Sequence, residues 1–146
     1  MKTKEFLHRL DDARIAAAIA EAEGRSRGEV RVHVTSSHVD DVQAAAARTF
    51  ERLGMTRTAE RNGVMIYVAP RDQRFAVIGD AGIHAVCGEA FWREVADAMR
   101  EEFKAGRFTD GNVAGIERTG QMLARHFPRE EGRTDANELR DEVSRD

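Results

Sequence analysis

Two apolar runs separated by a short turn, within residues 61–83 (RNGVMIYVAPRDQRFAVIGDAGI), constrain the fold of this chain most. Val64–Ala69 and Arg74–Ile78 are apolar on successive residues, which is typical of strands that helices cover on both faces. Pro70–Gln73 lies between the runs, and Pro70 suits a turn because it has no N–H to donate to a strand ladder. The segment therefore predicts a buried antiparallel β-hairpin that needs helices around it.

The rest of the chain supplies those helices and one more strand. Glu29–Thr35 alternates valines with polar residues, which predicts a strand with one solvated face near a sheet edge. Apolar spacing predicts helices at residues 11–23, 40–53, 83–86 and 89–105, and from Thr109 as N-cap to residue 127. The order α-β-α-β-β-α-α-α predicts an α/β fold, namely a three-layer α/β/α sandwich. Its mixed central sheet joins a parallel strand pair to the hairpin.

The composition divides the chain into one domain and a tail. Residues 1–128 have the length of a single hydrophobic core. Between Pro128 and Asp146, eleven of nineteen residues are charged, and only Leu139 and Val143 are sizeable aliphatics. Such a segment buries too little apolar surface to offset the entropy of ordering it. We expect residues 129–146 to be a mobile, charged C-terminal tail.

Charge and cysteine content narrow the class of protein. A net charge of −3 predicts no basic face for a polyanion, so we expect no nucleic-acid partner. Cys87 is the single cysteine, so an internal disulfide is excluded and nothing indicates an oxidising compartment. The N-terminal residues lack the apolar region of a signal peptide, and no apolar stretch approaches the ~20 residues that cross a bilayer. We expect a soluble, cytoplasmic protein.

Three local patterns resemble catalytic motifs only in their letters. Gly24–Gly28 (GRSRG) matches G-x-S-x-G, but it lies between a helix and a strand, the reverse of the order in a nucleophile elbow. The five histidines show no metal-binding spacing. Cys87 lies one turn from His84 near a helix start, which can lower a thiol pKa. Its apolar neighbours favour a small buried hydrophobe instead. No catalytic residue is identified.

The turn Gly79–Gly82 has two interpretations. It follows a strand and precedes a helix, a position where backbone N–H groups can hold an anion. It lacks the G-x-G-x-x-G spacing and a following Walker lysine, and Asp80 would repel a phosphate. One interpretation is a tight turn in which Asp80 caps the helix. The other is that Asp80 belongs to a cation site.

The hairpin register supports the cation interpretation. With the turn where we expect it, Gly63 pairs with Asp80, so Asn62 and Asp80 lie at the same end of the sheet. A parallel first strand also starts at that end, which brings Glu29 near, and Glu60 is close in sequence. Several oxygen donors without a lysine suit a hard divalent cation, calcium or magnesium. The predicted metal ligands are Asn62, Asp80 and Glu29, and no organic cofactor is expected.

Three segments in order also resemble the TPM domain, a family named for thylakoid-lumen proteins of photosystem II repair and related bacterial and animal proteins. AEGRSRGEVRVHV resembles its opening strand, residues 61–83 its hairpin, and FKAGRFTDGNVAGI its last helix start, a match from about Asp11 to Pro128. The resemblance implies an α/β/α sandwich with a divalent metal, chiefly calcium, near the turn after the hairpin. Asn62 and Gly79–Gly82 match that site region.

The chain departs from the family pattern beside this region. Many members have an acidic residue just after the last turn glycine and an aspartate about four positions later, where this chain has His84 and Gly88. The predicted cation site therefore has less negative charge around it than in those members. The resemblance implies a binding or accessory domain with a weak cation site and a protein partner from a membrane- or envelope-associated pathway. The alternative is a metal-dependent acid phosphatase acting on phosphomonoesters, and a third is a small-molecule binder.

Overall fold

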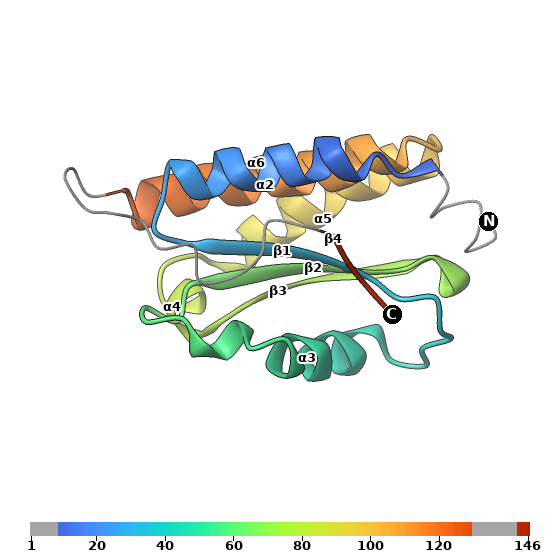
Figure 1. Ribbon diagram of the computed structural model, residues 1–146, viewed down its shortest axis with the longest axis horizontal. Coiled ribbons are helices and arrows are strands. Elements are labelled where there is room, and N and C mark those ends of the chain that lie inside the picture. The colour runs from blue at the N-terminus through green and yellow to red at the C-terminus, as the bar shows by residue number, and fades with distance from the viewer. Residues whose placement is uncertain (1–8, 130–142) are drawn as a thin grey trace.

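The computed structural model describes residues 9–129 and 143–146 and shows three layers (Figure 1). Helices α2, α5 and α6 cover one face of a central sheet, and α3 covers the other. The helices are α2 (Asp12–Gly24), α3 (Val42–Arg52), α4 (Ala81–His84), α5 (Glu89–Lys104) and α6 (Phe108–His126), with short 3₁₀ turns η1 (Met55–Arg57) and η2 (Pro70–Asp72). The predicted three-layer α/β/α sandwich is confirmed.

The sheet is mixed, with the strand order β3-β2-β1-β4. Its strands are β1 (Glu29–Val34), β2 (Gly63–Ala69), β3 (Arg74–Gly79) and β4 (Val143–Arg145). Strand β1 pairs in parallel with β2, and β2 pairs antiparallel with β3 through the turn η2. The hairpin and the parallel pair therefore form as the sequence predicts.

Strand β1 is an interior strand, so the prediction of a solvated face near the sheet edge is wrong. Its valines belong to the core cluster under α2 and α6. Alternation along the strand points its polar residues to the opposite face, on which α3 lies. His33 is only 1% exposed and stacks on Tyr67 with ring centroids 5.5 Å apart. Alternation of polar and apolar residues indicated two different faces correctly, but the polar face is covered at His33, which contacts Tyr67, Ser144 and Asp146.

The C-terminal residues supply the fourth strand, so the prediction of a mobile tail is wrong for residues 143–146. Strand β4 pairs in parallel with β1. The Asp146 amide donates to the Val34 carbonyl at 3.2 Å, and the Ser36 amide donates to the Asp146 carbonyl at 3.0 Å. Backbone hydrogen bonds to an open strand edge stabilise this segment even though it has few aliphatic side chains. The remainder of the expected tail, residues 130–142, lies outside the described residues.

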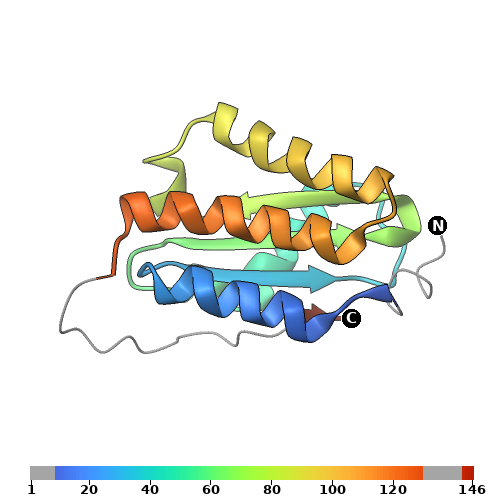
Figure 2. The ribbon, with the colours of Figure 1, turned by 90° about the horizontal axis from the view of Figure 1, so that it is seen from above.

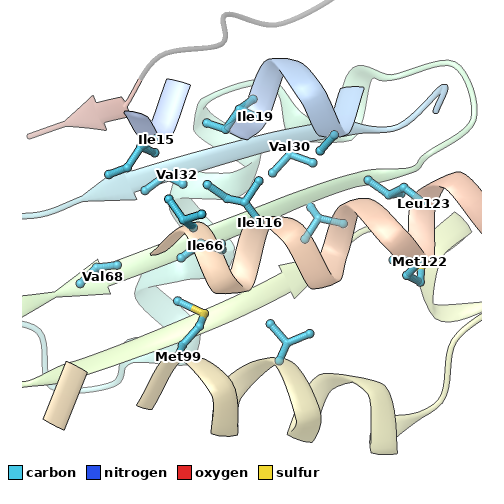
Figure 3. Close-up of a cluster of buried hydrophobic side chains, with 14 of the residues drawn as sticks. Ile15, Ile19, Val30, Val32, Ile66, Val68, Met99, Ile116, Met122 and Leu123 are labelled. Atoms are coloured by element: carbon cyan, nitrogen blue, oxygen red, sulfur yellow. The ribbon is translucent and has the colours of Figure 1, made fainter. Parts of the chain in front are cut away.

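The main core fills the space between the sheet and the three helices above it (Figure 3). Figure 2 shows α6 lying between α2 and α5 over this face. The contact is close at two glycines of α6: a Cβ at Gly115 would lie 2.6 Å from Met99 Sδ, and one at Gly120 would lie 2.8 Å from Ala22 Cβ. Close packing against α5 and α2 thus compensates for the low helix propensity of glycine.

Two helix starts differ from the prediction. Helix α4 starts at Ala81 because Asp80 caps it. Helix α6 starts at Phe108, so Thr109 is not its N-cap. The Thr109 hydroxyl instead accepts a hydrogen bond from the Asp11 amide at 3.0 Å, which ties the start of α2 to α6. Within residues 9–129 and 143–146, no helix combines the length and the apolar character that a membrane span needs.

Candidate functional site

The predicted strand register is confirmed, and it brings the predicted site residues to one end of the sheet. Gly63 pairs with Glu29 in β1, and its carbonyl accepts a hydrogen bond from the Asp80 amide at 3.0 Å. Asn62 immediately precedes Gly63, so it lies at the same end. We call this end of the sheet the Asp80 rim and define it by six residues: Arg27, Glu29, Glu60, Arg61, Asn62 and Asp80.

Asp80 is a buried carboxylate with two roles. Its Oδ1 accepts a hydrogen bond from the Ala81 amide at 2.8 Å, which caps α4. The Arg61 guanidinium binds both carboxylate oxygens, Nε to Oδ2 at 2.6 Å and Nη2 to Oδ1 at 2.8 Å. Burial raises the pKa of Asp80, but the hydrogen bonds from Arg61 and Ala81 and the Arg61 charge outweigh it and hold the pKa below its ordinary value. Asp80 is therefore ionised at neutral pH.

Arg61 and Arg27 are the two rim residues that the sequence analysis did not predict, and Arg61 is the one that pairs with Asp80. Its φ of 52° lies in the left-handed region, which is uncommon for a residue with a side chain. This conformation turns the chain just before β2 and aims the guanidinium at Asp80. The side chain is 51% exposed, so solvent reaches one side of the ion pair. Arg61 adjoins Asn62 in the sequence, but residue type does not predict the backbone conformation from which its guanidinium reaches Asp80.

Gly82 allows the turn after β3 to pack against the segment before β2. Its amide donates to the Arg61 carbonyl at 2.9 Å. A Cβ at this position would lie 2.4 Å from the Glu60 carbonyl oxygen and 2.7 Å from that of Arg61. Only glycine fits such an approach of two backbone segments. The glycine-rich turn therefore fixes how Asp80 and Arg61 face each other.

Arg27, the second arginine of the rim, binds the carboxylate of Glu60, which lies on the loop before β2. The two hydrogen bonds run from Nε to Oε2 at 2.9 Å and from Nη2 to Oε1 at 3.0 Å. Asn62, which is 1% exposed, donates its side-chain amide to the Arg27 carbonyl at 3.0 Å. These contacts join the segments that lead into β1 and β2. Asn62 thus has a structural role in orienting the rim.

Glu29 lies at the start of β1, where its amide donates to the Asn62 carbonyl at 3.4 Å. It is buried, so its carboxylate lies within the molecule rather than on the outer surface of the rim. In the described parts of the chain, no three histidine, cysteine, aspartate or glutamate side chains gather into a metal-holding group. The positive charges of Arg61 and Arg27 neutralise the negative charges of Asp80 and Glu60. A divalent cation at this rim must therefore compete with a guanidinium.

The other motifs have structural roles. The Ser26 hydroxyl of the GRSRG segment is buried; it donates to the Ala22 carbonyl and accepts from the Gly28 amide. Burial raises the pKa of the Cys87 thiol, which disfavours the reactive thiolate. The interpretation of GRSRG as a loop agrees with these contacts. Cys87, which we expected to be a small buried hydrophobe, is only partly buried.

A sequence model of the TPM domain matches residues 1–122. The structure is similar to that of the BA42 protein from the psychrophilic bacterium Bizionia argentinensis, with 38% identity and a TM-score of 0.86 over 94% of this chain and 96% of that one.

Two more distant solution structures share the fold alone. The N-terminal domain of a P. gingivalis protein has 16% identity and a TM-score of 0.59, over 82% of this chain and 76% of that one. The N-terminal domain of the cg2496 protein from Corynebacterium glutamicum has 14% identity and a TM-score of 0.60, over 85% of this chain and 74% of that one. Among curated proteins, none matches the chain.

Proposed function

The chain belongs to the TPM domain family, and on that premise we propose that it is a binding or accessory domain with a weak divalent-cation site at the Asp80 rim. One observation carries the proposal. The ionised Asp80 carboxylate is bound to a cationic side chain that is half exposed. A pair of this kind exchanges its cation more readily than a fully enclosed one, because solvent and ions reach the guanidinium.

The proposed ligands are oxygens of Asp80, Asn62 and Glu29, which suit calcium or magnesium. The Asn62 amide nitrogen donates to the Arg27 carbonyl, so the oxygen of the same amide is the atom it would offer to a cation. The affinity is expected to be weak for two reasons. The cation must displace Arg61 from Asp80, and His84 and Gly88 add no negative charge beside the turn.

The proposal predicts opposite effects of two substitutions on cation binding. Calcium, magnesium and manganese are titrated into purified protein while thermal unfolding is followed. Ligand at 100-fold excess over its dissociation constant adds about 2.7 kcal/mol to the free energy of unfolding. Arg61→Gln removes the competing cation and should strengthen calcium binding. Asp80→Asn removes the charged ligand and should abolish the stabilisation by calcium.

Asp72→Asn is the matched control. Asp72 is also a hydrogen-bonded aspartate, but it lies in the η2 turn at the other end of the sheet, where it binds His38. This variant should respond to calcium as the wild type does. If neither the wild type nor Arg61→Gln is stabilised by any of the three cations, the cation site is wrong.

The same proteins test the phosphatase alternative. In that mechanism a bound metal would polarise a phosphoryl oxygen and generate the attacking hydroxide. Metal-dependent turnover of p-nitrophenyl phosphate that Asp80→Asn abolishes, and Asp72→Asn does not, would replace the accessory function with an enzymatic one.

The proposed partner is a protein of a membrane- or envelope-associated pathway, as the family resemblance implies. The net charge of −3 supports a protein partner over a nucleic acid. Calcium-dependent retention of such a protein by the wild type, lost in Asp80→Asn, would connect the partner to the rim.

A further inference from the structure

A cavity lies beside the turn between β2 and β3. Figure 1 shows this turn at the end of the sheet opposite α4 and the Asp80 rim. The cavity has a volume of about 730 Å³, within the range of ~300–1,000 Å³ that is usual for small-molecule sites. We call it the Phe75 cavity. The residues that decide its chemistry come from β3, α5 and the start of α6: Arg74, Phe75, Arg100, Phe103, Lys104 and Phe108.

The wall of the Phe75 cavity is aromatic. Phe75 and Phe103 meet edge to face with ring centroids 5.3 Å apart, and Phe108 follows with its centroid 6.4 Å from that of Phe103. Phe75 and Phe103 are only partly buried, so they present apolar surface to the recess. Such a wall favours a hydrocarbon or aromatic body, because burying its apolar surface is stabilising at ~25 cal/mol per Å².

The charged side chains of the cavity are all cationic. Arg100 and Lys104 lie one turn apart on α5, and Arg74 lines the same cavity from the start of β3. The Arg100 guanidinium also donates a hydrogen bond to the Asp97 carboxylate at 2.8 Å. Within the described part of the chain, Arg74 and Lys104 form no ion pair, and the cavity lining contains no acidic residue. Three cations around one recess contrast with the negative charge of the whole chain.

We propose that the Phe75 cavity binds a small amphiphilic carboxylate. Its hydrocarbon body would lie against the three phenylalanines, and its carboxylate would lie between Arg74 and Lys104. Charge complementarity selects the anion, and the aromatic wall selects the apolar body. This site is separate from the Asp80 rim and does not depend on cation binding there.

The test uses decanoate as the probe and two glycine amides as reporters. Gly106 lines the cavity, whereas Gly82 lies at the Asp80 rim. Decanoate titrated into uniformly ¹⁵N-labelled full-length protein should shift the Gly106 amide resonance saturably and leave that of Gly82 unchanged. Acetate, which lacks the hydrocarbon body, and decyltrimethylammonium, which has the opposite charge, should each bind at least roughly tenfold more weakly.

Charge reversal supplies the second part of the test. The double variant R74E/K104E should bind decanoate at least roughly tenfold more weakly, because two attractions become repulsions. The matched control is R93E/R118E, which changes the net charge equally at exposed positions outside the cavity lining. It should bind as the wild type does. Thermal unfolding of both variants verifies that they are folded.

Several results would overturn the proposal. These are an absence of saturable binding by the wild type, equal binding by R74E/K104E, equal binding of decyltrimethylammonium, or a decanoate shift that falls on Gly82 rather than Gly106. The last result would assign the carboxylate to the Asp80 rim instead of the Phe75 cavity.

Discussion

Gly82→Ala is the substitution whose effect follows most directly from the geometry of the Asp80 rim. The added methyl carbon would lie 2.4 Å from the Glu60 carbonyl oxygen and 2.7 Å from the Arg61 carbonyl oxygen. Both obstacles are backbone atoms, which cannot move aside by a change of rotamer. The turn after β3 must therefore separate from the segment before β2, and the hydrogen bond from the Gly82 amide to Arg61 must lengthen or break.

The expected cost is about 2 kcal/mol in the free energy of unfolding. Overpacking that shifts backbone costs roughly 1–3 kcal/mol, and loss of one hydrogen bond contributes about 1 kcal/mol within that range. A single domain of this size has a total stability of about 5–15 kcal/mol, so the variant should remain folded. Its rim should be displaced, because the same contact positions Arg61 against Asp80.

Urea unfolding, followed by circular dichroism, measures the change. Gly24→Ala is the matched control, because a Cβ at Gly24 would meet nothing within 4 Å and the residue ends helix α2. That control should be more stable than the wild type by about 0.5 kcal/mol, as alanine loses less backbone entropy on folding. If Gly82→Ala were as stable as the wild type, with unchanged amide shifts for Asn62 and Asp80, the close approach at the rim would be refuted.

Four further predictions concern other parts of the chain. His38 binds two carboxylates, which raise its pKa above 6.5, so its NMR titration midpoint should lie above that value and fall in Asp72→Asn. Burial lowers the pKa of His33 below 6.5 in the folded protein. As the pH falls, the unfolded chain therefore protonates this histidine at a higher pH than the folded protein does. Stability should therefore fall as pH drops below about 6.5, and a His33→Gln variant should lose that part of the pH dependence in urea unfolding. Cys87 should react with a thiol reagent more slowly than free cysteine at pH 7, because burial raises its pKa. Gly115→Val should destabilise the protein by roughly 1–3 kcal/mol in urea unfolding, because α5 leaves no room for the side chain.

The hairpin and its register could be predicted because they are local. Two apolar runs and a proline turn between them determine which residues face each other, and this places Asp80 beside Gly63. Because Asn62 immediately precedes Gly63, this register also places Asn62 and Asp80 at the same end of the sheet. The parallel start of β1 at Glu29 follows from the crossover helix between the two strands.

Strand β4 could not be predicted because its contacts are distant in sequence. Ser144 hydrogen-bonds His33, 111 positions earlier, and the charged composition around it favours disorder on local grounds. The same pairing explains why the solvated face expected for β1 is covered. Sequence periodicity gives the two faces of a strand but not what covers them.

The balance of charge at the rim was missed for a different reason. The strand register places Glu29, Asn62 and Asp80 at one end of the sheet, as predicted, but the cation that balances Asp80 is supplied by Arg61. Arg61 has a left-handed backbone conformation, and nothing in residue type predicts that conformation for an arginine. The Phe75 cavity was missed because its walls come from separate elements.

The exchange of Arg61 for a divalent cation at Asp80 is tested most directly by following the Arg61 Nε–H resonance during a calcium titration. We expect this resonance and the Asp80 amide resonance to shift together and to saturate at one calcium concentration, while the Asp72 amide does not respond. An Arg61 Nε–H that remains unchanged up to millimolar calcium, with the Asp80 and Asn62 amides equally unchanged, would contradict the proposed exchange.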